Sequence, residues 1–226
     1  MPIINMVYKK KKWWKPWANT IAYYPLKWNL NDYSGNGYNA ISTTWTITYP
    51  DNEYANFSAA YAIFPNWYSN WTITADITIS VWVKDITPYW WEANIFGFWM
   101  DLDWWWWWII LRADANNPSS YLALTYTWNK LYQTSAYSTT SWVWHHLAVV
   151  VSCTNSYLKL YIDWVLKETK SWTNSLRASG KSSIWQLGNY SHRLNGNVSE
   201  LINERIAWGD TDVANYYNQT KANYWL

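Results

Sequence analysis

A tight β-hairpin across residues 157–170 limits the fold of this chain more than any other stretch. In its first half, apolar residues alternate with tyrosine and lysine, at Leu158, Leu160 and Ile162. This alternation is typical of a half-buried antiparallel hairpin. The turn falls at Asp163-Trp164, where a two-residue loop favours positive φ and therefore a residue such as glycine. The turn calls for glycine, and the sequence supplies tryptophan.

The same mismatch runs through the whole chain, which holds 24 Trp and only 7 Gly. Average usage would give about 16 glycines in a chain of this length, and β proteins rich in turns need many. The run Trp104–Trp108 makes sense as a flexible glycine loop, whereas five indoles would form a large exposed apolar patch.

We therefore interpret most of these tryptophans as glycines of the natural protein. Some bacterial lineages and their viruses read the UGA codon as glycine, while a common alternative translation table reads it as tryptophan. That difference alone produces the observed pattern. Trp82 and Trp144 fit as genuine tryptophans, and Trp208 is a third candidate. The alternative interpretation is a truly tryptophan-rich binding protein.

Length, charge and cysteine content exclude several classes of protein. The 226 residues suit one large β domain. The net charge of +2 comes largely from the lysine run Lys9–Lys12 with Lys15, so the domain lacks the basic surface that nucleic acid binding requires. Cys153 is the single cysteine and lies in an apolar strand, which excludes an internal disulfide and indicates a buried thiol.

We expect residues 1–19 to form a flexible basic tail or linker and residues 20–226 to form the folded domain. No apolar run is long enough to span a membrane. In the first twelve residues the apolar residues precede the positive charges, which is the reverse of a secretory signal. We expect either an export signal upstream of this segment or no export by that route.

Many short β runs, with frequent turns between them, predict an all-β chain. The clearest strand is 77–84, whose alternating residues Ile77, Ile79, Val81 and Val83 share one face. Strand 144–152 is so apolar that both of its faces must be buried. Further strands are expected at 45–49, 54–63, 94–99, 109–113, 121–127, 130–137, 184–187 and 196–202. Only 210–219 looks helical, with Asp210 as its N-cap. The pattern predicts a two-sheet antiparallel jelly-roll sandwich with one short C-terminal helix.

These segments, in this order, resemble the laminin-G-like or concanavalin A-like lectin/glucanase jelly roll. The matching pieces are AYYPLKWNLNDYSGNGYNA, ITISVWVK, WVWHHLAVVV, LKLYIDWVLKE, LNGNVSEL and the tail DTDVANYYNQTKANYWL. The family that this chain resembles usually has glycine at the positions of Trp28, Trp142 and Trp164, and tryptophan at those of Trp82 and Trp144. It commonly has an acidic pair where this chain has Ser199 and Glu200.

The sequence lacks the catalytic patterns that enzymes of this fold use. Glucanases of the fold place carboxylates at alternate positions on one strand, so that the acid and the nucleophile share a face. No E-x-D-x-E pattern occurs here. His145 and His146 are adjacent on a strand, point to opposite faces and lack metal ligands nearby, so we interpret them as structural. We therefore expect no enzymatic activity.

A calcium site is one interpretation of the loop NDYSGNG. Asp32, Ser34 and Asn36 offer oxygen ligands that calcium accepts, and the resemblance implies one such ion because related jelly rolls often hold it. The alternative is an Asx-type turn in which Asp32 bonds the amides of its own loop.

The expected function is a non-catalytic binding module for carbohydrate or a cell-surface ligand, within a larger extracellular or cell-surface protein. Aromatic rings in the loop TPYWWEAN, at Tyr89, Trp90 and Trp91, would stack on sugar rings. The expected partners are a glycan or a cell-surface protein, without nucleic acid or membrane insertion, and the domain is expected to be monomeric. The alternatives are a structural or adhesion domain of a surface or viral fibre protein with no sugar ligand, and a glycoside hydrolase.

Overall fold

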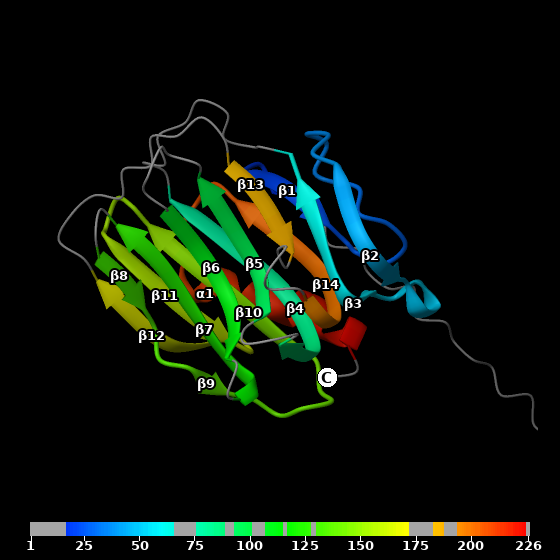
Figure 1. Cartoon of the computed structure of the whole chain (residues 1–226). Coiled ribbons are helices and arrows are strands. Elements are labelled where there is room, and N and C mark those ends of the chain that lie inside the picture. Colours follow the sequence, from blue (N-terminus) through cyan, green and yellow to red (C-terminus); the bar gives the residue numbers. More distant parts are fainter. Residues whose placement is uncertain are drawn as a thin grey trace, which may run out of the picture.

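The computed structural model describes residues 17–65, 76–88, 93–100, 107–114, 117–127, 130–171, 183–187 and 194–224. In these residues, fourteen strands pair antiparallel and form two sheets packed face to face (Figure 1). One short helix packs on the side of the first sheet that faces away from the second. This arrangement confirms the all-β sandwich with a C-terminal helix.

The first sheet carries the candidate site. Its strand order is β12-β11-β10-β4-β14, and β1 pairs with the second half of β14. The bounds are β1 (Thr20–Tyr24), β4 (Ile77–Pro88), β10 (His145–Ser152), β11 (Tyr157–Ile162), β12 (Val165–Ser171) and β14 (Leu194–Glu204).

The second sheet continues the ladder from β14 through β3, β13, β5, β6 and β7 to β8, with β2 paired to β3 and β9 to β7. The bounds are β2 (Ser42–Thr48), β3 (Ala55–Phe64), β5 (Ala93–Met100), β6 (Trp107–Asp114), β7 (Asn117–Thr127), β8 (Lys130–Gln133), β9 (Tyr137–Ser138) and β13 (Ser183–Leu187). A single-turn 3₁₀ helix, η1 (Pro50–Asn52), leads into β3.

The two sheets join where β3 and β4 bulge around Gly196 of β14. The strand register shifts on both sides of Gly196, and the bulges place Ala59 at φ 49° and Asp85 at φ 55°. Gly196 has φ 130°, and a Cβ there would lie 2.7 Å from the carbonyl oxygen of Asp85. Only glycine fits this close approach of two backbones, so Gly196 is required for the corner.

Strand β10 is buried on both faces, as its sequence predicts, and so are residues 77–83 of β4. One face of each strand points into the core between the sheets, with Ile77, Ile79, Val81, Val83, Leu147, Val149 and Val151. The other face of β10 packs Ala148 and Val150 under the helix. The first sheet is therefore covered on both sides along these two strands.

The helix α1 (Asp210–Thr220), followed by the 3₁₀ turn η2 (Lys221–Tyr224), covers this outer face with Val213, Tyr216, Thr220 and Tyr224. The prediction of Asp210 as N-cap is wrong by one residue. Gly209 is the N-cap, and its N–H donates to the Asp212 carboxylate at 2.9 Å. The Asp210 carboxylate instead accepts from the Tyr161 hydroxyl at 2.6 Å, which ties the helix start to β11.

The hairpin turn has the backbone that its position requires. Asp163 and Trp164 have φ values of 50° and 65°, the left-handed conformation of a type I′ turn. Trp142 also has positive φ, at 68°. Trp28, the third position where the family usually has glycine, does not have positive φ; the left-handed residue nearby is Leu26. Trp142 and Trp164 are exposed, by 79% and 51%.

The tryptophans interpreted as genuine lie in the interior. Trp82 and Trp208 are fully buried, and Trp144 is nearly so. Elsewhere the predictions need correction: β6 already begins at Trp107, inside the predicted loop, and the strand predicted at 130–137 divides into β8 and β9. Most of the predicted tail lies outside the described residues, although the Trp17 ring contacts that of Trp208, with ring centres 5.1 Å apart. Within the described residues, no helix is long and apolar enough to cross a membrane.

Candidate binding face

The outer face of the first sheet has two halves, one covered by α1 and η2 and one uncovered. In the covered half, polar side chains of β4 and β10 bond to the helix segment or to each other. The Thr78 hydroxyl donates to the carbonyl of Ile206 at 2.7 Å and accepts from the Trp208 N–H at 2.9 Å. Trp82 Nε1 donates to the Thr220 hydroxyl at 3.1 Å. These bonds fix the C-terminal segment on the sheet.

The two histidines make contacts within the protein. His146 is fully buried in the covered half, where Nε2 lies 2.6 Å from the Ser80 hydroxyl, and burial lowers its pKa to about 3. His145 lies at the strand end, with Nδ1 2.7 Å from Asp163 and Nε2 2.9 Å from the carbonyl of Thr140. Burial alone would lower the pKa of His145, but these contacts outweigh it and raise the pKa.

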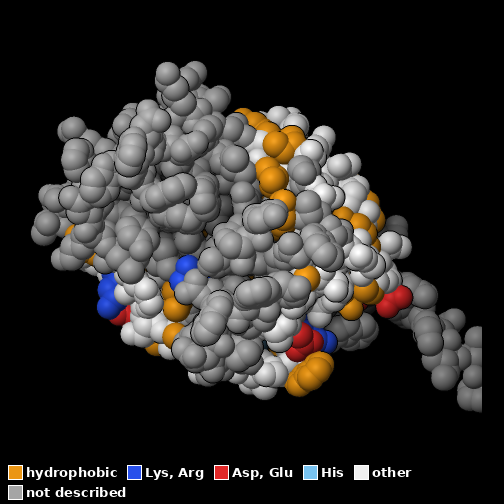
Figure 2. Space-filling view, in the orientation of Figure 1, with side chains coloured by type: hydrophobic (Ala, Val, Ile, Leu, Met, Phe, Trp, Pro, Cys, Tyr) orange, Lys and Arg blue, Asp and Glu red, His pale blue; other side chains and the backbone are white. Residues whose placement is uncertain are grey.

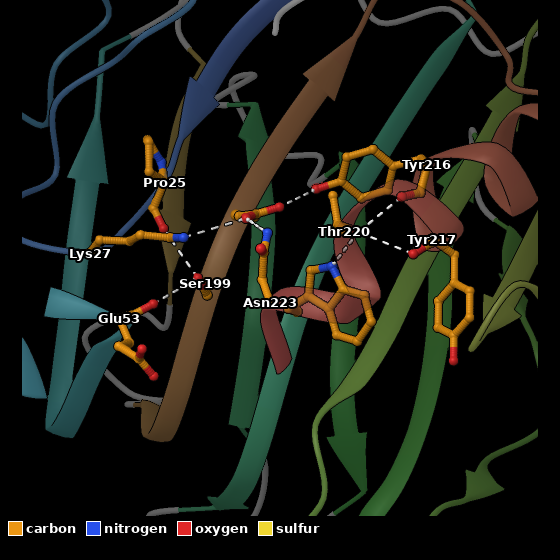
Figure 3. Close-up of polar contacts among 10 residues, drawn as sticks. Pro25, Lys27, Glu53, Ser199, Tyr216, Tyr217, Thr220 and Asn223 are labelled. Atoms are coloured by element: carbon orange, nitrogen blue, oxygen red, sulfur yellow. Dashed lines mark hydrogen bonds and ion pairs between the residues drawn. The ribbon is translucent and has the colours of Figure 1, made fainter. Parts of the chain in front are cut away.

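A buried polar cluster around Glu200 anchors the helix (Figure 3). The Glu200 carboxylate accepts hydrogen bonds from Tyr216 at 3.1 Å and Asn223 at 3.3 Å, and it lies 3.7 Å from the Lys27 ammonium. Burial raises the pKa of Glu200, and the nearby charge of Lys27 opposes this effect. The preceding Ser199 hydroxyl bonds to the backbone carbonyl of Pro25 at 3.2 Å. The position of the family's acidic pair therefore holds β14 and the helix together.

Two other carboxylates also hold strands together. Glu168 on β12 accepts from the Ser135 N–H at 2.7 Å and the Tyr137 hydroxyl at 3.0 Å, so it links the two sheets at their edge. Burial alone would raise the pKa of Glu168, but bonds from Lys170, Ser135 and Tyr137 lower it to about 2. Asp163 accepts from the backbone N–H of His146 at 2.9 Å.

The predicted calcium ligands Asp32, Ser34 and Asn36 do lie together, but the oxygen atoms of Asp32 and Ser34 already make hydrogen bonds within the protein. Asp32 Oδ1 accepts from the N–H groups of Tyr23 and Ser34, at 3.0 and 2.8 Å. Asp32 Oδ2 accepts from the Ser34 hydroxyl at 2.8 Å and the Tyr38 N–H at 3.0 Å. The Asn36 side chain donates to the carbonyl of Ile21 at 2.9 Å. The hydrogen bonds to the Asp32 carboxylate fit the Asx-type turn and leave neither of its oxygen atoms open to an ion. These contacts do not support a calcium site in this loop, which stays a prediction.

The uncovered half, which continues from β4 and β14 of the first sheet onto β3 and β2 of the second, carries a row of polar side chains across these four strands. Thr48 of β2 pairs with Asn56 of β3, Asn56 with Asn197 of β14, and Asn197 with Lys84 of β4. Residues paired directly across strands share a face, and their neighbours Ile47, Phe57, Val198 and Val83 point into the core. The row therefore lies on the outer face, where Thr48 is exposed and the other three residues are half-buried. We call these four residues the polar row.

Most hydrogen-bonding groups of the polar row have no partner in the part of the chain that the structure describes. Asn56 Nδ2 donates to Asn197 Oδ1 at 2.6 Å, and the two remaining side-chain atoms, Asn56 Oδ1 and Asn197 Nδ2, have no partner among the described residues. The Thr48 hydroxyl and the Lys84 ammonium likewise have none among the described residues. The covered half of the same face is bonded to the helix, and the uncovered half presents its donors and acceptors outward.

Aromatic rings border the polar row. Trp144 directly precedes β10, whose first residue His145 pairs with Val83, so Trp144 lies beside Lys84 in register. The half-buried Tyr54 packs edge-on against Trp144, with ring centres 5.4 Å apart, and Trp144 packs in turn on Tyr224. Figure 2 shows the side of the molecule opposite to the helix, where charged side chains of both signs and a hydrophobic group lie near the C-terminus marked in Figure 1. The row and its aromatic border form the candidate binding face.

Sequence reasoning did not find the polar row. The residues predicted to stack on sugar, Tyr89, Trp90 and Trp91, lie outside the described residues. The available signal was the polar residue at every second position, as in Asn195-Gly-Asn197 or Thr46-Ile-Thr48, but that pattern also marks any solvated strand face.

Comparison with known proteins places this geometry in a structural family. The family model described as concanavalin A-like lectin/glucanases superfamily matches residues 56–204. No curated protein sequence gives a significant match.

Several solved structures share the fold. Domain 4 of AbnA, a GH43 extracellular arabinanase from Geobacillus stearothermophilus solved in complex with arabinotriose, has 19% identity and a TM-score of 0.69 over 87% of this chain and 97% of that one. The binding domain of Paraclostridial Mosquitocidal Protein 1 has 18% identity and a TM-score of 0.66, over 88% of this chain and 52% of that one. The binding domain of botulinum neurotoxin DC, in complex with rat synaptotagmin II, has 17% identity and a TM-score of 0.58, over 89% and 52%.

The chain thus spans nearly all of the arabinanase domain and about half of each toxin domain. At these identities the likeness shows a shared fold, and the family match extends over most of the chain. This chain belongs to the concanavalin A-like lectin/glucanase superfamily.

Proposed function

We propose that this chain is a non-catalytic binding module that recognises carbohydrate on its candidate binding face. The observation that carries the proposal is the polar row, where most amide, hydroxyl and ammonium groups have no partner among the described residues and point outward beside aromatic rings. Sugar hydroxyls both donate and accept hydrogen bonds, and sugar rings offer CH groups to aromatic side chains. The face offers both kinds of contact.

Two comparisons support this proposal. The arabinanase domain of similar fold was solved with an oligosaccharide, and a toxin binding domain of similar fold was solved with a protein partner. A glycan or a cell-surface protein is therefore the ligand class that we propose, with an extracellular or cell-surface location. In the described residues, Glu168, Asp163 and Glu200 make structural contacts, which supports binding rather than hydrolysis.

A glycan array, followed by titration of each hit, tests the proposal. We expect binding to a limited set of oligosaccharides, weakened by Asn56→Ala or Asn197→Ala and unchanged by Thr169→Ala, an exposed position on β12. A clean array together with binding to cells stripped of glycans would favour the alternative, a structural or adhesion domain. Release of reducing sugar from a polysaccharide panel would favour a hydrolase.

We also propose that Trp142 and Trp164 are glycines in the natural protein, through reassignment of the UGA codon. Both have the left-handed backbone that glycine adopts without strain, and both are exposed. Trp82 and Trp208 fill the interior and support the opposite assignment at their positions. The polar row contains no tryptophan, so the proposed binding function does not depend on this question.

A further inference from the structure

The polar row has a charge at only one end. Thr48, Asn56 and Asn197 are neutral, whereas Lys84 carries an ammonium group that makes no ion pair or hydrogen bond within the described residues. Three other lysines of the first sheet and the loops around it form ion pairs: Lys27 with Glu200, Lys159 with Asp210 and Lys170 with Glu168. Lys84 is thus a half-buried cation that faces outward without a counter-ion in the described part of the chain.

The acidic residue next to Lys84 does not neutralise it. Asp85 lies in the β4 bulge, and its Oδ1 accepts the backbone N–H of Trp142 at 2.8 Å. This bond holds Asp85 toward the loop that precedes β10, on the side away from Asn197. Adjacent strands lie about 4.8 Å apart, so the row from Thr48 to Lys84 extends over roughly 14 Å, the length of a short oligosaccharide.

We propose that the polar row binds an acidic oligosaccharide, with a carboxylate of the sugar on the Lys84 ammonium and sugar hydroxyls on Asn197, Asn56 and Thr48. This inference rests on the proposed carbohydrate-binding function and adds the class and direction of the ligand. Asn197 Nδ2 donates to a sugar oxygen, Asn56 Oδ1 accepts from a sugar hydroxyl, and the Thr48 hydroxyl does either. The contact of Lys84 with a carboxylate is charge-assisted and therefore the strongest of the set.

The experiment uses uronic-acid oligosaccharides, each paired with its methyl-esterified form, which keeps the shape and removes the charge. Titration calorimetry of the full chain measures both affinities for the wild type and for Lys84→Met, Lys84→Arg and Lys167→Met. Lys167, on the exposed edge strand β12, is the matched control. Circular dichroism melts check that each variant is folded.

We expect the wild type to prefer the acid over its ester by about tenfold or more, because a hydrogen bond to a charged group contributes about 1.5–3 kcal/mol. Lys84→Met abolishes this preference, while Lys84→Arg and Lys167→Met keep it. Equal affinities of the wild type for acid and ester, or a preference that survives in Lys84→Met, overturn the inference and leave carbohydrate binding in place. Absence of binding to any glycan, charged or neutral, overturns the proposed function itself.

Discussion

Lys27 and Glu200 form an ion pair in the interior, with 3.7 Å between the ammonium nitrogen and Oε1 and both side chains at least 95% buried. Glu200 also accepts hydrogen bonds from Tyr216 of α1 and Asn223 of η2. The pair therefore connects the loop after β1, strand β14 and the C-terminal segment. Glu200 itself has φ 49°, in a bulge of β14.

Removal of the lysine charge from this pair should destabilise the domain strongly. Lys27→Met leaves an uncompensated carboxylate in the interior, which typically costs about 3–5 kcal/mol. Urea denaturation measures the free energy of unfolding. The control is Lys159→Met, whose partner Asp210 is 68% exposed, so loss of this ion pair should cost less than about 1 kcal/mol. Similar losses in the two variants would contradict a structural role for the Lys27–Glu200 pair.

The buried His146 predicts loss of stability in acid. Burial lowers the folded-state pKa of His146 from its ordinary value near 6.5 to about 3, so the unfolded chain binds a proton first as the pH falls. The His146 contribution is therefore complete above pH 6.5 and is lost progressively toward pH 3. Unfolding free energies at pH 7, 6, 5 and 4 measure this slope for the wild type and for His146→Gln.

The contribution of His146 is the difference in unfolding free energy between the wild type and His146→Gln at each pH. Glu204 has the opposite effect, because burial raises its pKa to about 7 and its contribution is lost as the pH rises. Both proteins contain Glu204, so its effect cancels. If the wild type and His146→Gln lose stability in parallel between pH 6.5 and 4, the buried neutral state of His146 is wrong.

Asp32 tests the calcium prediction against the turn that the structure shows. Its carboxylate accepts four hydrogen bonds, from Tyr23, Tyr38 and the N–H and hydroxyl of Ser34. We expect Asp32→Ala to lower the melting temperature equally with and without a chelator, because about 1 kcal/mol is lost for each bond that water does not replace. A wild type that melts lower in chelator, with Asp32→Ala insensitive to it, would instead establish a calcium ion that binds the folded state.

Local pattern was enough to predict the strands whose surroundings are uniform. Ile79, Val81 and Val83 alternate with Ser80, Trp82 and Lys84 because one face of β4 meets the core, while the other meets the helix at Trp82 and lies beyond it at Lys84, and period-two alternation records that difference directly. The sequence also predicts the helix, but it places the N-cap at Asp210 instead of Gly209. Both residue types favour the N-cap position, and the Asp210 side chain bonds to Tyr161 on β11, a tertiary contact that the local sequence does not reveal.

The polar row could not be predicted in the same way. Asn56 and Asn197 touch across 141 positions of sequence, and their pairing depends on how β14 bends at Gly196. Half-buried asparagines on a strand have no local signature that distinguishes a binding residue from a solvated one. The distinction came from the helix, which covers one half of the face and leaves the other open.

Single substitutions to glycine separate the two interpretations of the tryptophans. Trp142 and Trp164 hold positive φ values, which cost a residue with a Cβ about 1–2 kcal/mol, so Trp142→Gly and Trp164→Gly should each raise the free energy of unfolding or leave it unchanged. Trp82→Gly and Trp144→Gly empty positions in the aromatic cluster with Tyr224 and should cost about 3–5 kcal/mol.

For the whole chain, we expect a version with glycine at every tryptophan except Trp82, Trp144 and Trp208 to express as a soluble monomer and to melt higher than the all-tryptophan chain. Mass spectrometry of the protein from its natural source reads positions 142 and 164 directly. Tryptophan found there, together with a more soluble all-tryptophan chain, would refute codon reassignment and make Trp142 and Trp164 part of an aromatic binding surface.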